Sequence, residues 1–447
     1  SLNFELKTKN PKVFFKNKEI KIKSISTDFK LKNFFSKKIN LEEIKISTDK
    51  NKIQNLIEVA RIYKNNPQLF ILSKTVKDGF VSIDSKISFN DDGSIKRNFF
   101  IDGKIKNLKI KLLNDNIIEN INLNFLIKDK DYLIYNFSSI YQSIKIKSNQ
   151  IKIFDNTKDL TFQGDISNIE NQLDPSKFSF FVNDTFKNFF KEDITISSSN
   201  KFSFKLSKKM KISDTRVQSK ISIKKFEYSN DFLKSFFPGY KKNLKIENNN
   251  ITFDYDNGDY KVIGKSKLNI NGDIDDIRYE FNKNNKEFLY DLNFELVNSA
   301  INLKMLDYTK KKEDKGSLKI KGKYLPSSFF VLKSVKFAQD KNLIDIKNIK
   351  FNKSNKIQSI DEISLSIFNN NDNPSKLNIK RKNNNYSIIG EIFDGTKLVD
   401  EILFSKNEDN FFDLFDNLNS NVSILIDTAY LSKIDFFSSL DANLIIK

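Results

Sequence analysis

The chain has 447 residues, of which 38% are hydrophobic and 30% are charged, and its formal net charge is +19. Histidine and cysteine are absent, which excludes imidazole-based catalytic triads, most zinc and iron sites, and disulfide or thiol chemistry. Lysines occupy alternate positions along the whole chain and arginines are few and scattered, a pattern typical of solvated strand faces rather than of a nucleic-acid-binding surface.

The first 79 residues combine short strands with a pair of helices. Alternation predicts strands at 13–15, 20–25 and 44–46. The first helix is capped by Asp49 or Asn51 and carries one apolar stripe made of Ile53, Leu56, Ile57, Ala60 and Tyr63. Pro67 suits the first turn of a second helix, which carries Leu69, Leu72 and Val76 and is closed by Gly79. We expect these short helices near residues 51–78 to cap the sheet as a lid or plug; the alternative is a partner-binding helix.

From residue 80 to residue 447 the chain reads as one strand after another. In segments such as 144–147 and 318–321, an apolar residue alternates with Lys, Asn, Asp or Ser, which gives a strand one apolar and one wet face. Short polar links between such strands predict a mainly β protein, a long antiparallel meander curled into an elongated apolar groove. The predicted strands are 80–89, 98–112, 121–128, 143–154, 159–166, 201–206, 218–227, 250–255, 260–271, 277–282, 287–297, 317–324, 343–351, 360–368, 377–380, 385–393 and 421–427. Helical or coiled interruptions are expected at 184–191, 231–238 and 409–418.

Two features at the chain ends indicate a fragment of a longer protein. The chain opens at Ser1 without methionine, and it stops inside an apparent strand at 443–447. No run of about 18 apolar residues is present, so no segment reads as a membrane-spanning helix.

Glycines recur through this strand-rich region in a common setting: an apolar residue, any residue, Gly, a charged residue and an apolar residue. The pattern surrounds Gly103, Gly164, Gly272, Gly322 and Gly390. Glycine within a strand is typical of a bulge or bend, and the apolar parity shifts after Gly103, from Ile101 and Ile105 to Leu108. The spacing of these segments is irregular, which excludes a solenoid of fixed period.

Asparagine and aspartate are expected to form the turns, because both tolerate a left-handed backbone. Segments 90–94 and 256–259 are examples, and the general bias toward Lys, Asn, Ile and Phe is typical of AT-rich codon usage. The acidic pairs at 91–92, 275–276 and 361–362 could serve a glycosidase or bind calcium, but we interpret them as turn residues. The lysine-rich run 310–315 is interpreted as a solvated hairpin tip.

Three groups of segments resemble the AsmA-like superfamily of Gram-negative envelope proteins, including its large members with a domain of unknown function ahead of an AsmA-like C-terminal region. They are the glycine-containing segments, the stretches 116–154 and 342–368, and the helix pair that precedes the long strands. The resemblance implies a periplasmic β-groove, anchored to the inner membrane by a part outside this segment, that moves phospholipid toward the outer membrane. It implies outer-membrane proteins as candidate partners and a build similar to that of bridge-like lipid-transfer proteins.

Physical reasoning independently favours a groove for acyl chains. Each exposed CH₂ group costs roughly 0.8 kcal/mol in water, so a lipid that leaves a bilayer needs a continuous apolar path. Such a path needs no cofactor and no covalent chemistry, and we expect no enzyme activity. The predicted lining residues share one strand parity and are Phe99, Ile101, Ile105, Ile144, Ile146, Phe202, Phe204, Ile221, Ile223, Ile251, Phe253, Leu292, Phe294, Leu318, Ile320, Ile363 and Leu365.

The sequence thus predicts two domains, residues 1–79 with strands and a helix pair, and residues 80–447 with the curled sheet. The favoured function is lipid binding and transfer by a non-catalytic envelope protein. The runner-up is a structural or adhesive β-protein whose apolar faces pair with each other, and a carbohydrate-active β-protein is a third reading.

Overall fold

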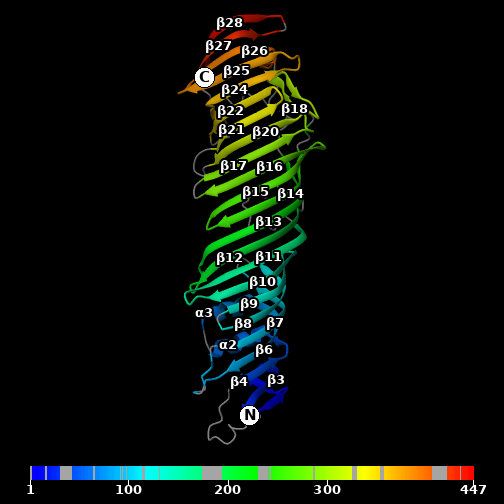
Figure 1. The fold of residues 1–447 in the computed structure, drawn as a ribbon, viewed down its shortest axis with the longest axis vertical. Coiled ribbons are helices and arrows are strands. Elements are labelled where there is room, and N and C mark those ends of the chain that lie inside the picture. The colour runs from blue at the N-terminus through cyan, green and yellow to red at the C-terminus, as the bar shows by residue number, and fades with distance from the viewer. Residues whose placement is uncertain are drawn as a thin grey trace. The chain divides into compact units, whose positions relative to one another are not determined.

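A computed structural model describes residues 3–15, 18–30, 43–63, 66–90, 92, 94–96, 98–112, 116–129, 131–173, 194–229, 240, 243–284, 287–324, 330–352, 357–404, 420–432 and 434–446. Of the described residues, 77% lie in strands and 8% in helices, and 26 of these strands form one open, mostly antiparallel sheet (Figure 1). This confirms the predicted mainly β antiparallel meander. The chain divides into two compact units, unit 1 (Ser1–Leu173 and Thr195–Lys220) and unit 2 (Asp174–Ile194 and Ile221–Lys447).

In unit 1, most strands pair with a strand that is next or next but one in the sequence. β1 and β2 both pair with β3, and β3 is followed in the sheet by β4, β6, β7, β8, β9, β10 and β11, all antiparallel. Its elements are β1 (Asn3–Lys9), β2 (Lys12–Phe15), β3 (Lys18–Lys30), β4 (Glu43–Thr48), β5 (Asn51–Lys52), α2 (Ile53–Tyr63), α3 (Pro67–Thr75), β6 (Val76–Ser88), β7 (Phe100–Lys111), β8 (Ile117–Lys128), β9 (Asp131–Tyr141), β10 (Ile144–Asp155), β11 (Asp159–Leu173) and β12 (Ile194–Ser207). Strand β13 (Ile212–Ser229) has residues in both units.

Unit 2 is also mostly antiparallel, with one parallel pair before its last strand. Each strand pairs with the next, except that β17 pairs with β20 and β22 pairs with both β23 and β24; β26 and β27 are parallel and connected through α5. Its elements are β14 (Asn243–Asp256), β15 (Asp259–Ile270), β16 (Asp273–Asn284), β17 (Glu287–Leu296), β18 (Ile301–Leu303), η4 (Lys304–Leu306), β19 (Tyr308–Lys310), β20 (Gly316–Tyr324), β21 (Phe330–Gln339), β22 (Asn342–Phe351), β23 (Ile357–Ser359), β24 (Glu362–Phe368), β25 (Pro374–Lys382), β26 (Asn385–Asp394), α5 (Thr396–Phe404), β27 (Ser420–Tyr430) and β28 (Phe436–Ile446).

The two N-terminal helices are present, but their ends differ from the prediction. The Asn51 side chain accepts a hydrogen bond from Lys21 N at 2.8 Å and donates to Lys21 O at 3.0 Å, so it ties β5 to β3 instead of capping α2. α3 begins at Pro67 as predicted, with Asn66 as its N-cap, but it ends at Thr75. Gly79 therefore closes no helix and lies inside β6. The predicted domain boundary after residue 79 also falls inside β6, which pairs with β4 and β7.

Left-handed residues in the middle of strands cause the shifts of apolar parity. Asn107, Asn120 and Asn248 have φ of 52°, 52° and 51°, and each lies at a register shift between its strand and a neighbour. The predicted parity shift between Ile105 and Leu108 is confirmed, but Asn107 causes it rather than Gly103. An extra residue in one strand bends the pair and increases its twist, so these bulges curve the sheet.

Asparagine side chains satisfy the backbone groups that the bulges leave unpaired. Asn122 accepts from Asn107 N at 3.1 Å on the neighbouring strand and donates to Asn120 O at 2.8 Å, two residues before it. Asn171 makes the same two hydrogen bonds at another position: it accepts from Lys145 N at 3.0 Å and donates to Ile169 O at 3.4 Å. Backbone groups without partners are costly, so these asparagines stabilise bulges, in addition to the turns that the sequence predicted for this residue type.

Glycines within the strands make room for side chains of the neighbouring strand. Gly103, Gly264 and Gly322 lie directly opposite Phe125, Tyr279 and Tyr290, and a Cβ on these glycines would lie 2.1, 2.0 and 2.0 Å from the aromatic side chain. The predicted association with bulges holds at Gly322, where the register shifts. Gly272 instead forms a turn with Asn271, with φ of 99° and 55°, between the predicted strands 260–271 and 277–282, so the predicted association with bulges fails there.

Several other predictions can be compared with the structure. Strands β9 and β21 were missed, while the turn at 256–259 is confirmed, with φ of 49° at Asn257 and 104° at Gly258. The predicted helical segments 184–191, 231–238 and 409–418 lie outside the described residues. The run 310–315 is exposed at Lys311 and Lys312, as predicted, but Lys310 is completely buried.

Candidate functional site

One face of the sheet in unit 2 is apolar across twelve strands. Cross-strand register defines a central row of residues, in which each residue lies opposite the next. The row consists of Ile251, Gly264, Tyr279, Leu292, Ile320, Val335, Ile346, Ile363, Ile379, Ile388, Ile424 and Ala442. Most of these side chains are partly exposed rather than buried. Several also pack against small buried clusters: Val335, Ile346 and Ile363 against one, and Ile388 and Ile424 against another. The row is therefore a partly covered apolar surface.

The central row contains or adjoins the predicted lining residues of β14, β17, β20 and β24. Leu292, Ile320, Ile251 and Ile363 belong to it, and Phe253 lies on the same face of β14. Phe294, Leu318 and Leu365 belong to a second row next to it, here called the inner row, made of Phe294, Leu318, Phe337, Ile344, Leu365, Leu377, Gly390, Ile426 and Leu440. The structure therefore places these eight residues on one face. Ile221 and Ile223 lie on β13 and are half-buried.

Unit 1 has an apolar face of the same kind. Ile101 lies opposite Ile127 and Ile105 opposite Leu123, and Ile144 connects through Tyr141 to Ile118. Phe204 stacks on Phe162 with ring centroids 4.7 Å apart, and Phe202 stacks on Phe204 at 6.0 Å. Phe99 precedes β7, and Ile146 lies opposite Ser139. All the predicted lining residues in unit 1 are half-buried.

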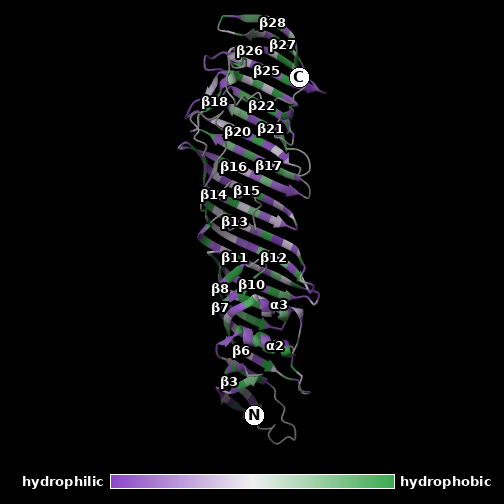
Figure 2. Cartoon of the chain, turned by 180° about the vertical axis from the view of Figure 1, so that it is seen from behind, coloured by the Kyte–Doolittle hydropathy of each residue, from purple (hydrophilic) through white to green (hydrophobic). Residues whose placement is uncertain are grey.

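Helix α2 covers part of the apolar face of unit 1. Ile57 is buried with Val76, Leu108 and Ile121, and Ile53 and Ile105 pack against this cluster. Figure 2 shows α2 and α3 in front of the strands, which alternate between hydrophobic and hydrophilic residues. The helix packs against β6 and shares this buried cluster with residues of β7 and β8.

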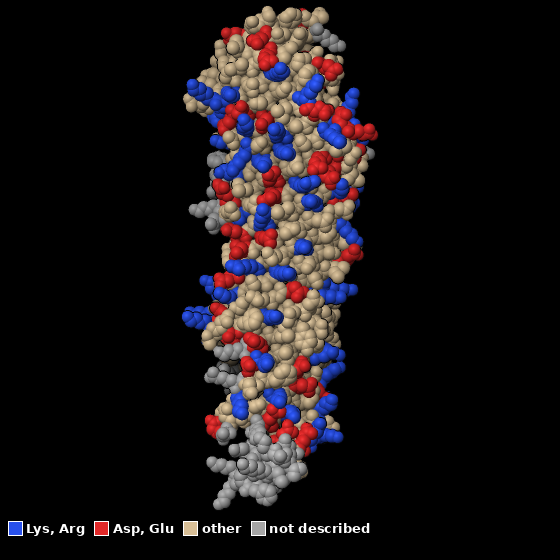
Figure 3. Space-filling view, viewed as in Figure 1, with Lys and Arg blue, Asp and Glu red and all other residues tan. Residues whose placement is uncertain are grey.

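The opposite face of unit 2 carries many charged residues, which form ion pairs between neighbouring strands, alongside exposed Ile263, Ile389 and Leu425. Lys267 and Asp276, Lys321 and Asp291, and Lys347 and Glu362 face each other at 2.7, 2.8 and 3.0 Å, among other such pairs. Hydrogen bonding from Lys347 lowers the pKa of the Glu362 carboxyl. Figure 3 shows lysines and acidic residues interspersed over unit 2. Carboxylates on the same surface thus partly neutralise the positive charge of the lysines.

A small hairpin of the same chain covers the inner row. It comprises β18, η4 and β19, and it buries Ile301 and Tyr308 together with Leu296, Phe337 and Ile367. Phe294, Leu318 and Leu365 pack against this cluster. The predicted lining residues of the inner row are therefore covered by protein in this part of unit 2, whereas the central row is outside the cluster.

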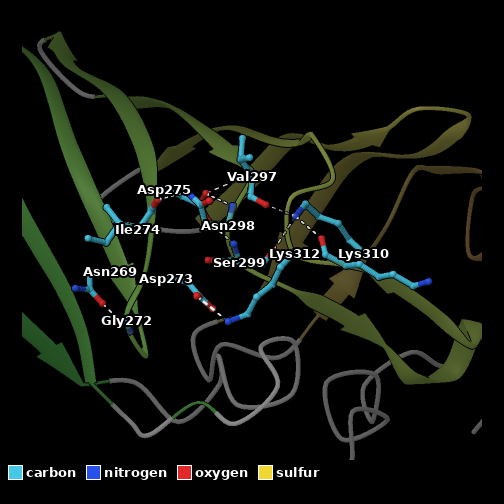
Figure 4. Close-up of polar contacts among 11 residues, drawn as sticks. Asn269, Gly272, Asp273, Ile274, Asp275, Val297, Asn298, Ser299, Lys310 and Lys312 are labelled. Atoms are coloured by element: carbon cyan, nitrogen blue, oxygen red, sulfur yellow. Dashed lines mark hydrogen bonds and ion pairs between the residues drawn. The ribbon is translucent and has the colours of Figure 1, made fainter.

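Two buried charged residues fix the hairpin in place (Figure 4). The Asp275 carboxylate accepts hydrogen bonds from the backbone N–H groups of Val297, Asn298 and Ser299 at 2.8, 2.7 and 2.9 Å. Lys310 donates from Nζ to Val297 O at 3.2 Å and Ser299 O at 2.8 Å, and burial lowers its pKa. Asp275 lies inside β16 and not in a turn, which corrects the interpretation of the 275–276 pair. This role was not predicted for Asp275 or Lys310, because both residues bind backbone atoms, and the sequence alone does not show which backbone atoms lie near a side chain.

Aromatic residues lie along the end of the strands opposite the hairpin. Successive ring centroids of Phe253, Tyr260, Phe288 and Tyr324 are 6.0, 6.1 and 6.1 Å apart, and Tyr290 stacks on Phe330 at 5.4 Å. All belong to the apolar face: Phe253, Tyr260, Phe288, Tyr290 and Tyr324 share strand parity with the central row, and Phe330 lies opposite Tyr324 after a register shift in β21. We call Phe253, Tyr260, Phe288, Tyr324 and Phe330 the aromatic rim. Only Phe253 was predicted; the alternation of Tyr260 and Phe288 with polar residues is the signal that could have found the rest.

Polar groups on this face are largely satisfied. Ser266 Oγ and Tyr279 OH both donate to Asn249 Oδ1, at 2.7 and 2.6 Å, and burial raises the pKa of Tyr279. Within the described residues, no cluster of three acidic side chains could hold a metal ion, and no helix there is long and apolar enough to cross a bilayer. The face thus offers apolar contact along a row of strands, with aromatic groups at one side.

Comparison with known proteins gives no relative: no family model matches the chain, and no curated protein or solved structure matches it.

Proposed function

We propose that the chain is a non-catalytic lipid-binding and lipid-transfer segment, in which the apolar face of unit 2 takes up phospholipid acyl chains. The observation that carries this proposal is the central row, whose residues are in register across twelve strands and mostly remain partly exposed. Soluble proteins rarely leave a continuous row of apolar side chains partly exposed unless it binds something.

The dimensions and chemistry of the row fit acyl chains. Strands are about 4.8 Å apart, so a row across twelve strands is roughly 50 Å long, more than the ~30 Å hydrocarbon thickness of a bilayer. Apolar side chains on nearly every strand of the row allow a bound acyl chain to remain in contact as it moves, because each exposed CH₂ would cost about 0.8 kcal/mol. The resemblance to AsmA-like proteins supports the wider proposal: periplasmic location, an inner-membrane anchor outside this segment, and transfer toward the outer membrane.

The test is lipid content together with two matched variants. Purified protein is extracted and its phospholipid measured by mass spectrometry against a protein of equal size purified in parallel. Ile320→Asp places a charge on the central row, and Lys319→Asp places the same residue on the charged face one position away. Lipid should be present in the wild type, fall strongly in Ile320→Asp and persist in Lys319→Asp. Absence of lipid above background in the wild type, or equal loss in both variants with both folded, contradicts the proposal.

A structural β-protein is the second candidate, and one observation favours it. Helix α2 in unit 1 and the hairpin in unit 2 cover parts of the apolar faces with the protein's own residues. If self-coverage were the purpose of these faces, the protein would bind no lipid and the Ile320→Asp variant would differ only in stability. The same lipid measurement therefore separates the two functions.

A further inference from the structure

Among the described residues, one lysine lies beside two aromatic residues of the rim. Lys283 of β16 lies directly opposite Tyr260 on β15 and opposite Phe288 on β17. Its Nζ is 5.7 Å from the Tyr260 ring centroid and 5.8 Å from that of Phe288. These distances correspond to cation–π contacts, which hold the ammonium group at the edge of the apolar face.

Lys283 differs from the lysines of the charged face. It shares strand parity with Phe281 and Tyr279, so it belongs to the apolar face. Lys261, Lys267 and Lys321 on the charged face each pair with a carboxylate within 3 Å. Among the described residues, no carboxylate forms an ion pair with Lys283, so its positive charge is not neutralised by the protein there.

Polarity changes in one direction along the strands that carry this lysine. In β16 the inward side chains run from Ile277, buried with Leu268 and Tyr240, through Tyr279 to the exposed ring of Phe281 and then to Lys283. Burial also raises the pKa of the neighbouring Tyr260 hydroxyl. A lipid has the same sequence of groups, with apolar chains, an interfacial ester region and a charged phosphate. Aromatic side chains and lysines take the matching positions at bilayer interfaces.

We propose that Tyr260, Lys283 and Phe288 form a headgroup site, in which the Lys283 ammonium binds the phosphate of a phospholipid while the acyl chains lie on the central row. This proposal depends on the proposed lipid-binding function and adds an orientation and a preference to it. The site should favour lipids with a net negative headgroup, because a zwitterionic headgroup brings its own ammonium group near the lysine. Such an exposed charge contact should change affinity by about fivefold or less.

The experiment measures binding of two phospholipids that carry the same fluorescent acyl chain, one with a phosphatidylglycerol and one with a phosphatidylethanolamine headgroup. Lys283→Gln removes the charge, Lys283→Arg keeps it, and Lys265→Gln removes a charge from the opposite face of β15. The wild type, Lys283→Arg and Lys265→Gln should prefer phosphatidylglycerol severalfold. Lys283→Gln should bind both lipids equally, with its phosphatidylethanolamine affinity unchanged.

The outcomes separate this site from the broader function. If the wild type binds neither lipid, the proposed function itself fails. If it binds both lipids equally, or if Lys283→Gln keeps the preference, lipid binding stands but the headgroup site is wrong. A further arm adds inorganic phosphate at constant ionic strength. Release of phosphatidylglycerol by phosphate but not by chloride would assign Lys283 to free phosphate and overturn the lipid assignment, whereas retention supports it.

Discussion

Replacing Asp275 by Asn should loosen the hairpin that covers the inner row. The carboxylate accepts three backbone N–H groups within 2.9 Å in a buried position. An amide keeps one acceptor oxygen but turns an NH₂ group toward a backbone N–H, so at least one buried donor loses its partner. Hydrogen bonds to a charged group contribute about 1.5–3 kcal/mol, and an unsatisfied buried donor costs about 1–3 kcal/mol. We therefore expect a local loss of about 2–4 kcal/mol.

Hydrogen exchange measures this loss at the amides concerned. A decrease of about 2–4 kcal/mol accelerates exchange at Val297, Asn298 and Ser299 by roughly 30-fold to 1,000-fold, since each 1.4 kcal/mol is a factor of ten. Asp276→Asn is the matched control, because this neighbouring carboxylate is half-exposed and pairs with Lys267 across the charged face. Its effect on the same amides should be below about threefold. Equal acceleration in the two variants would refute the role given to Asp275.

Three further predictions concern the strands themselves. Gly264→Ala should destabilise unit 2 by about 2 kcal/mol or more in urea unfolding, because the new Cβ would meet the Tyr279 ring; an unchanged midpoint would contradict the close packing. Asn122→Ala removes both hydrogen bonds of this side chain at the bulge and should lower the free energy of unfolding by about 1–3 kcal/mol. Amide hydrogen exchange next to the bulge that is as slow as in the wild type would contradict this. Lys347 lowers the pKa of the Glu362 carboxyl below its ordinary value of 4.5. The ionised carboxylate therefore stabilises the fold at pH values above 4.5, and this contribution is lost as the pH falls through the pKa of the folded state. The stability difference between wild type and Glu362→Gln should therefore disappear in acid; a constant difference would contradict it.

The alternation of side chains was sufficient to predict the class of fold and much of the apolar face. Leu292, Ile320 and Ile363 were chosen from strand parity alone, and the register places them in one row. Parity is a local property that a strand conserves, so it can be read without knowing which strands pair. The order of strands also followed, because consecutive strands usually pair.

Features that depend on partners across the sheet could not be predicted. Asn107 shifts the parity through a left-handed backbone, and nothing distinguishes it in the sequence from the many asparagines in turns. Lys310 was interpreted as a solvated residue because it begins a charged run, yet three backbone carbonyls surround its Nζ. The rim was missed in the same way, since Lys283 becomes distinctive only when register brings Tyr260 and Phe288 beside it.

The most direct test of lipid contact is photocrosslinking with a phospholipid that carries a diazirine in its acyl chain, followed by mass spectrometric mapping of the adducts. We expect adducts on peptides that contain central-row residues such as Leu292, Ile320 and Val335, and localisation to these side chains rather than to Asn293, Lys319 and Lys336 between or opposite them. Adducts confined to residues of the charged face, or none under conditions in which lipid is bound, would show that acyl chains do not lie on the central row.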